Sequence, residues 1–154
     1  MKHFSRSVAA LVAVGLIAAC ATQQEKDKAA IDKFRQQSAG QYVSEQSGAT
    51  LFIAPIRARM VTDEAIYVER HQGTGVMIRI VNVAVGKDGK LRLNALTFAQ
   101  EGQWRELRDN PELLTALLPK DVRPAGTCDI TPAADNNSIT FSCGGSAPEV
   151  FKRL

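Results

Sequence analysis

One short stretch of the chain carries most of the side chains that could do chemistry. Residues 65–85, AIYVERHQGTGVMIRIVNVAV, include Tyr67, Glu69, His71 and Arg79. Because the first three occupy every second position, they share one face if the segment is an extended strand. A carboxylate paired with an arginine inside a barrel would give an apolar cavity a polar contact point for a ligand. The stretch predicts two β-strands, joined by a glycine-rich turn, in the wall of a small barrel.

The length of this turn decides which side chains share a face. A three-residue turn at 73–75 places Glu69 opposite Arg79, and its last glycine suits a bulge. A turn of two or four residues places Glu69 opposite Ile78 instead. We favour the three-residue turn because it sets opposite charges across from each other.

The orientation of the hairpin leaves two interpretations open. In the first, the isoleucine-rich face forms the core, and the Glu69–Arg79 pair is exposed to solvent and worth little. Alternation of residue types alone favours this interpretation. In the second, the opposite face lines a cavity, and the isoleucine-rich face packs outward against a helix or another protein. The ligand-binding residues are then Tyr67, Glu69, Met77, Arg79 and Val81.

The N-terminal end predicts the cellular location. Residues 1–19 contain Lys2 and Arg6, followed by an apolar run of about a dozen residues, which is too short to span a bilayer and fits a signal peptide. The segment LIAAC, which ends at Cys20, resembles the lipobox of bacterial lipoproteins, in which the cysteine is acylated and becomes the first mature residue. Ala21 offers no acidic signal for inner-membrane retention. We expect a lipid anchor on Cys20, at the periplasmic face of the outer membrane.

The mature chain that this cleavage would leave is nearly neutral. Loss of the two signal-peptide cations leaves 17 of the 19 basic residues against 16 acidic ones. No basic patch remains that would favour nucleic-acid binding. Residues 20–28 are polar and form the lipidated tether, whereas residues 29–154 form one domain of ordinary size.

The sequence of this domain predicts a short helix followed by short strands. Residues 29–39 have helical periodicity and end before Gly40. About eight strands follow, and their spacing predicts an antiparallel sandwich or barrel. A helical insertion at 110–119 begins with an Asn-Pro cap and carries four leucines, and Trp104 and Leu107 could join its packing. The expected strands are 41–46, 50–61, 64–71, 76–85, 91–99, 127–131, 139–143 and 150–154.

Two cysteines remain in the mature domain and predict one disulfide. An even number of cysteines in an oxidising compartment favours pairing. If a hairpin turns at 133–138, Cys128 lies opposite Cys143 and Ile130 opposite Phe141, all on one face. The wide spacing is not that of a redox Cys-x-x-Cys motif, so we expect a structural role.

Several short motifs resemble the T-type phycobiliprotein chromophore lyases (CpcT/CpeT). The Tyr-x-Glu of Tyr67 and Glu69, followed by the strand that bears Arg79, is similar to two successive strands of that family. The resemblance covers about 40–145 and implies a lipocalin-like (calycin) barrel whose cavity holds a bilin for transfer to a protein cysteine. It also implies that these three residues line the cavity and that the two cysteines pair. The matching segments are 40–42, 65–69, 78–81, 126–129 and 141–143.

The departures from this family change the expected ligand. The second strand lacks one arginine, the glutamine and both tyrosines of the family pattern. The expected cavity is therefore more apolar and suits bilin propionates less well. A lipoprotein of the envelope is also not where light-harvesting antennae assemble. We expect a relative that binds an apolar or amphipathic small molecule, with bilins, other tetrapyrrole-like molecules and lipidic molecules as candidates.

Two other classes of function rank lower. Small lipoproteins with one disulfide resemble periplasmic lysozyme inhibitors, which insert a loop into an enzyme cleft, and Thr74 or residues 144–146 could form such a loop in an envelope protein-interaction module. A hydrolase ranks third, because His71 lies beside no nucleophile motif and no paired carboxylates stand out. We assign no catalytic residues and leave enzymatic activity open. With one histidine beyond residue 19, no metal is predicted.

Overall fold

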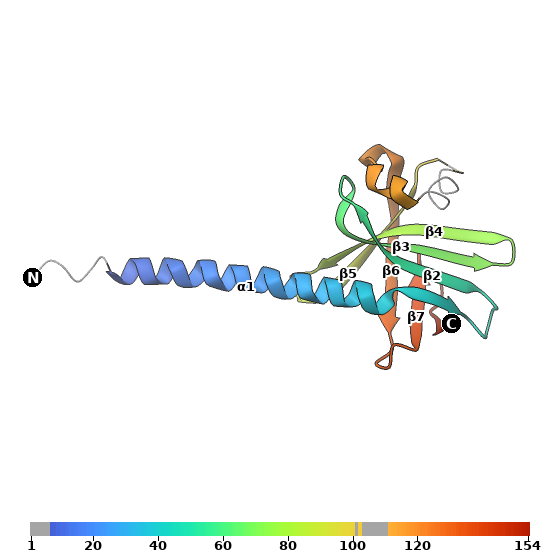
Figure 1. The fold of residues 1–154 in the computed structure, drawn as a ribbon, viewed down its shortest axis with the longest axis horizontal. Coiled ribbons are helices and arrows are strands. Elements are labelled where there is room, and N and C mark those ends of the chain that lie inside the picture. Colours follow the sequence, from blue (N-terminus) through green and yellow to red (C-terminus); the bar gives the residue numbers. More distant parts are fainter. Residues whose placement is uncertain (1–6, 101, 103–110) are drawn as a thin grey trace, which may run out of the picture.

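Eight strands form a closed antiparallel barrel, and a long helix leads into it (Figure 1). The computed structural model describes residues 7–100, 102 and 111–154, with side chains from residue 22 onward except those of 111 and 112. Each strand pairs with the next along the chain, and β1 closes the ring against β8. The predicted fold class, a mainly β lipocalin-like barrel of about eight strands, is confirmed. The strands are β1 Gly40–Val43, β2 Thr50–Ala58, β3 Thr62–Gln72, β4 Gly75–Val85, β5 Leu91–Phe98, β6 Val122–Pro132, β7 Ser138–Cys143 and β8 Glu149–Arg153.

The barrel interior is filled by apolar side chains from all eight strands. Alternation along each strand sends every second side chain inward, where its removal from water stabilises the fold by about 25 cal/mol per Å² of apolar surface. Phe141 and Phe151 meet edge to face, with ring centroids 6.0 Å apart. The strand residues of this interior cluster include Tyr42, Leu51, Ile53, Ile66, Val68, Val81, Val83, Leu93, Ala95, Cys128, Ile130, Ile139, Phe141, Cys143 and Phe151.

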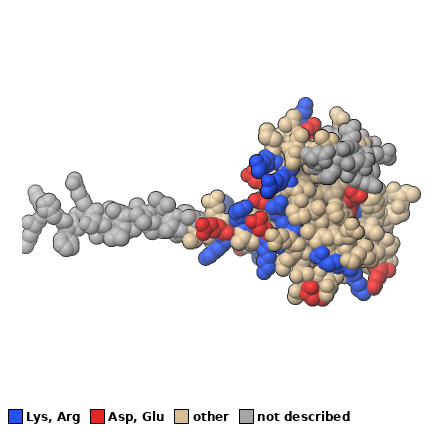
Figure 2. Space-filling model, in the orientation of Figure 1, with Lys and Arg blue, Asp and Glu red and all other residues tan. Residues whose placement is uncertain are grey.

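Helix α1 (Ser7–Ser38) is longer than expected, because it continues without a break through the segment predicted as a tether. Its last turns belong to the domain, since Phe34 is 6% exposed and packs into the interior cluster. Arg35 donates hydrogen bonds to the carbonyls of Ile56 and Ala65 and pairs with Glu64 at 2.7 Å. Charged side chains of both signs accordingly gather where α1 meets the barrel (Figure 2). None of the described helices is both long and apolar enough to cross a membrane.

The end of α1 is held by a side chain from the last strand. The Arg153 guanidinium donates hydrogen bonds to the carbonyls of Gln37 and Ala39, which are among the helix-terminal acceptors that lack partners within the helix. The same guanidinium donates to the Tyr42 hydroxyl at 2.8 Å and lies 4.9 Å from that ring. The helix is therefore fixed to the closing seam between β1 and β8.

A second, smaller apolar cluster lies outside the barrel. The insertion predicted as one helix over 110–119 has instead a 3₁₀ helix, η1 (Pro111–Ala116), and a second, η2 (Pro119–Asp121), begins where the helix was expected to end. The predicted cap Asn110 lies outside the described residues. Leu114 and Leu117 pack with residues on the outer faces of β3, β4 and β5. Trp104 and Leu107, which were expected to join this packing, lie outside the described residues. The members of this outer cluster are Ala65, Tyr67, Ile78, Ile80, Phe98, Leu114 and Leu117.

The cysteine hairpin has the predicted register. Cys128 pairs opposite Cys143 and Ile130 opposite Phe141, and the two cysteines are joined as a disulfide. Both cysteines belong to the interior cluster, so the disulfide fastens β6 to β7 from inside the barrel. The turn between the strands places Asn136 at φ 57°, a left-handed conformation that asparagine tolerates better than most residues.

Candidate ligand-binding site

The β3–β4 hairpin has a two-residue turn, and the predicted three-residue turn is wrong. Gln72 pairs with Gly75, so that only Gly73 and Thr74 lie between the strands. Gly73 has a φ of 57°, as the first central residue of a type II′ turn requires, and turns of this type match the twist of the flanking strands. The preferred backbone geometry of the turn therefore decides the register. The stabilisation from an ion pair across two strands is small at a surface and does not override it.

The correct register separates Glu69 from Arg79. Glu69 lies opposite Ile78, and Arg79 lies opposite Val68. Val68 and Val81 belong to the interior cluster and Met77 packs against it, so Arg79 is on the inward face. Tyr67 belongs to the outer cluster, and Glu69 shares its face. Of the predicted ligand-binding residues, Met77, Arg79 and Val81 face the interior, whereas Tyr67 and Glu69 do not.

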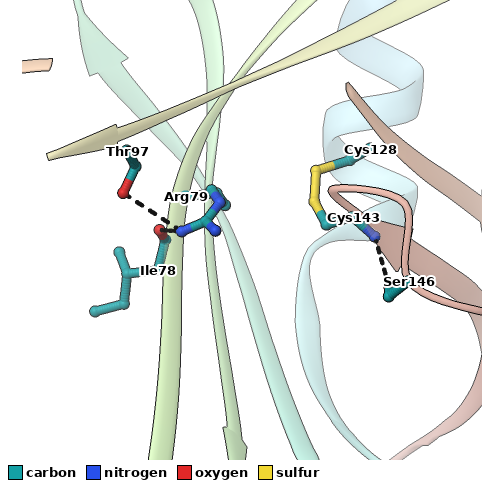
Figure 3. The surroundings of a disulfide bond; sticks show 6 residues. All are labelled: Ile78, Arg79, Thr97, Cys128, Cys143 and Ser146. Atoms are coloured by element: carbon teal, nitrogen blue, oxygen red, sulfur yellow. Dashed lines mark hydrogen bonds between the residues drawn. A yellow bond between two sulfur atoms is a disulfide. The ribbon is translucent and has the colours of Figure 1, made fainter. Parts of the chain in front are cut away.

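Arg79 is a partly buried cation in the barrel. Its Nη1 donates to the Ile78 carbonyl at 2.7 Å and to the Thr97 hydroxyl at 3.4 Å, whereas its Nε is buried and has no hydrogen-bond partner. Burial lowers the pKa of this guanidinium from its usual value, because a low-dielectric environment disfavours the charged form. Figure 3 shows the guanidinium turned toward Ile78 and Thr97, in the surroundings of the disulfide. No ion pair between Arg79 and a carboxylate of the described residues is found.

Tyr67, Glu69 and His71 form a hydrogen-bonded row on the outer face of β3. The Tyr67 hydroxyl donates to Glu69 Oε2 at 2.6 Å, and Glu69 Oε1 contacts His71 Nε2. The Glu69 side chain is 10% exposed and that of His71 is 36% exposed. The burial of Glu69 is thus compensated by hydrogen bonds, as a buried carboxylate requires.

An ion pair spans the barrel between β3 and β8. Arg70 pairs with Glu149 at 2.8 Å, and the Arg70 guanidinium lies 5.9 Å from the Phe151 ring. Burial raises the pKa of Glu149, but hydrogen bonds from Ser44, Ser47 and Arg70 and the charge of Arg70 outweigh it and hold the pKa below its usual value. The partners are 79 residues apart in sequence.

A pocket opens where β5 and β6 separate. Their pairing is irregular between Asn94 and Leu96, and it does not continue past the pair of Asn94 with Thr127, although each strand does. The resulting pocket has a volume of about 460 Å³, within the usual range for small-molecule sites. Its apolar walls include Phe34 of α1, Leu93 of β5 and Ile130 of β6, all members of the interior cluster.

Polar groups border the same pocket. Asn94 and Thr127 lie where the strands part, Asp129 and Thr131 follow along β6, and Cys128 places the disulfide at the wall. Among the described residues, no group of three histidine, cysteine or acidic side chains is placed to hold a metal ion. The sequence did not predict this pocket, because it depends on where two strands that are distant in the chain cease to pair.

The fold and site together define a small closed antiparallel barrel with a pocket in its side wall, and a helix whose Phe34 lines that pocket. No family model, curated protein or solved structure matches the chain. The resemblance to the T-type lyases therefore rests on the short motifs in residues 40–42 and 65–81 and around the two cysteines.

Proposed function

We propose that this protein is a lipid-anchored envelope protein whose barrel binds a small apolar or amphipathic molecule. The observation that carries this proposal is the pocket of about 460 Å³ between β5 and β6. Its apolar walls, Phe34, Leu93 and Ile130, belong to the interior cluster, and concave sites that combine apolar walls with polar groups are the usual form of ligand pockets. Phe34 of α1 lines the pocket, so the end of the helix forms part of its wall.

The ligand of this pocket would carry an acidic group. Arg79 does not line the pocket, but it lies on the inward face of β4 as a cation without a carboxylate partner among the described residues and with a buried, unpartnered Nε. A ligand carboxylate would supply the missing acceptor, and charge-assisted hydrogen bonds of this kind are stronger than neutral ones. Bilins, haem and fatty acids all combine a large apolar body with carboxylates, so they are suitable probes for this site.

Lipidation of Cys20 would give the barrel a fixed stand-off from the membrane. Helix α1 continues from Cys20 to Ser38, a length of about 28 Å at 1.5 Å per residue, and its last turns, which carry Phe34 and Arg35, pack on the barrel. Replacing Cys20 by serine should prevent incorporation of labelled palmitate and release the protein from membranes. Incorporation that persists in Cys20→Ser would contradict this part of the proposal.

Binding is tested with the full chain in detergent. Biliverdin, haem and palmitate are added separately, and bound ligand is measured by absorbance for the first two and by native mass spectrometry for all three. Arg79→Gln should weaken binding by about tenfold or more, as expected for loss of a charge-assisted contact. Arg57→Gln, which removes an exposed arginine, is the matched control. Binding that is absent for all three probes, or equal in the two variants, would count against the proposal.

A second candidate function is an envelope protein-interaction module of the lysozyme-inhibitor type. The observation that favours it is the exposure of two loops, the β3–β4 turn around Thr74 and residues 144–148, which follow β7. Inhibition of lysozyme by the full chain tests this candidate. Loss of inhibition in Thr74→Arg would support it, and no inhibition at micromolar concentration would rule it out.

A further inference from the structure

The outer surface of β1, β2 and β3 carries a groove of about 420 Å³, distinct from the pocket between β5 and β6. Strand pairing sets Phe52 between two polar side chains, because Gln41 and Glu69 lie opposite it on either side, and it sets Thr50 opposite His71. Directly opposed side chains on one face are close neighbours. The groove is therefore a built arrangement of an amide, a hydroxyl, an imidazole and an aromatic ring.

The imidazole in this groove has a fixed orientation. His71 Nε2 contacts Glu69 Oε1, while the other oxygen of Glu69 accepts a hydrogen bond from Tyr67. A carboxylate that holds one ring nitrogen determines which tautomer is present and how the ring points. In neutral His71 the Nε2–H faces Glu69, so Nδ1 is the nitrogen that can accept a hydrogen bond from a bound molecule.

The charges around the groove exclude most ligand classes. Among the described residues, no lysine or arginine lines the groove. An anionic ligand would meet only the imidazole of His71, which is already paired with Glu69. A cationic ligand would have to compete with Tyr67 and His71 for the oxygens of Glu69. A neutral ligand that forms hydrogen bonds fits this environment best.

The apolar part of the groove narrows the choice further. Phe52 is 39% exposed, although its ring packs edge-on against Tyr67 with centroids 6.2 Å apart. A half-exposed ring flanked by hydroxyl, amide and imidazole groups matches a molecule with one apolar face and a rim of hydroxyls. We propose that this groove binds a neutral saccharide, with a sugar ring against Phe52 and its hydroxyls bonded to Gln41, Thr50 and His71 Nδ1.

The test uses the full chain in a zwitterionic detergent, because alkyl-glycoside detergents would compete for the site. Maltotriose and the trimer of N-acetylglucosamine are titrated separately, and binding is followed by backbone amide shifts in two-dimensional NMR. At least one saccharide should give saturable shifts at residues 50–52 and 69–71. Phe52→Leu, which keeps an apolar side chain but removes the ring, should weaken binding by about tenfold.

Three matched variants keep the test decisive. Thr50→Val should weaken binding by removing a hydroxyl at nearly constant volume, whereas Val150→Ala, on exposed β8 surface, should leave it unchanged. Arg79→Gln should also leave it unchanged, which separates this groove from the interior site. The absence of saturable shifts with both saccharides, or shifts that persist equally in Phe52→Leu and Thr50→Val, would overturn the proposal.

Discussion

Replacing Arg79 by methionine should stabilise the protein and abolish the proposed binding of acidic ligands. The guanidinium has a buried Nε without an acceptor, and an unsatisfied polar group of this kind costs about 1–3 kcal/mol. Its two hydrogen bonds recover part of that cost, and the one to Thr97, at 3.4 Å, is at the long limit for such a bond. Methionine keeps the unbranched apolar stem and removes the charge. We expect the free energy of unfolding to rise by about 1 kcal/mol.

Urea unfolding of the full chain measures this change, with the slope against denaturant used to check that the unfolded state is unaltered. Arg57→Met serves as the control, because Arg57 is exposed and surface substitutions usually change stability by less than about 0.5 kcal/mol. A loss of about 1 kcal/mol or more in Arg79→Met would show that the guanidinium is satisfied in the folded protein. The reasoning that assigns it to a ligand would then fail.

Three further predictions concern the disulfide, the β3–β4 turn and the Glu149 carboxylate. Replacing Cys128 and Cys143 by alanine should lower the free energy of unfolding by about 3 kcal/mol, as calorimetry would measure, because the disulfide spans 15 positions; a loss below about 1 kcal/mol would contradict a structural role. Gly73→Ala should cost about 1 kcal/mol in urea unfolding because its φ is 57°, and an unchanged midpoint would argue against the two-residue turn. The pKa of Glu149 is lowered on folding, so its contribution is full at neutral pH and is lost as the pH falls below its usual 4.5 through the folded value. The stability difference between the wild type and Glu149→Gln should therefore shrink as the pH falls below about 4.5, and a difference that stays constant there would contradict the lowered pKa.

Much of the barrel was predictable because its signals are local. Short strands with turn residues between them indicated the fold, and the Cys128–Cys143 pairing followed from counting outward from one turn. The same counting failed at the β3–β4 hairpin. There a turn one residue shorter than predicted places Glu69 opposite Ile78, so that Arg79 lies on the other face of the sheet. The glycine-threonine-glycine sequence fits turns of more than one length, and the weight given to a charge pair selected the wrong one.

The features that make the sites were harder to foresee, because they depend on contacts between distant segments. The Arg70–Glu149 pair joins residues 79 positions apart, and no local pattern points to it. The pocket exists because β5 and β6 stop pairing at Asn94 and Thr127. The row of Tyr67, Glu69 and His71 was visible as an alternation, but its placement on the outer face depended on the register.

Crystallography of the full chain with saturating biliverdin, haem or palmitate tests the central claim most directly. The account predicts ligand density between β5 and β6, in contact with Phe34, Leu93 and Ile130, with the acidic group of the ligand directed toward Arg79. Density of this kind for any one of the three probes would support a ligand-binding barrel. Water alone in the pocket with all three, or a ligand bound only outside the barrel, would contradict it.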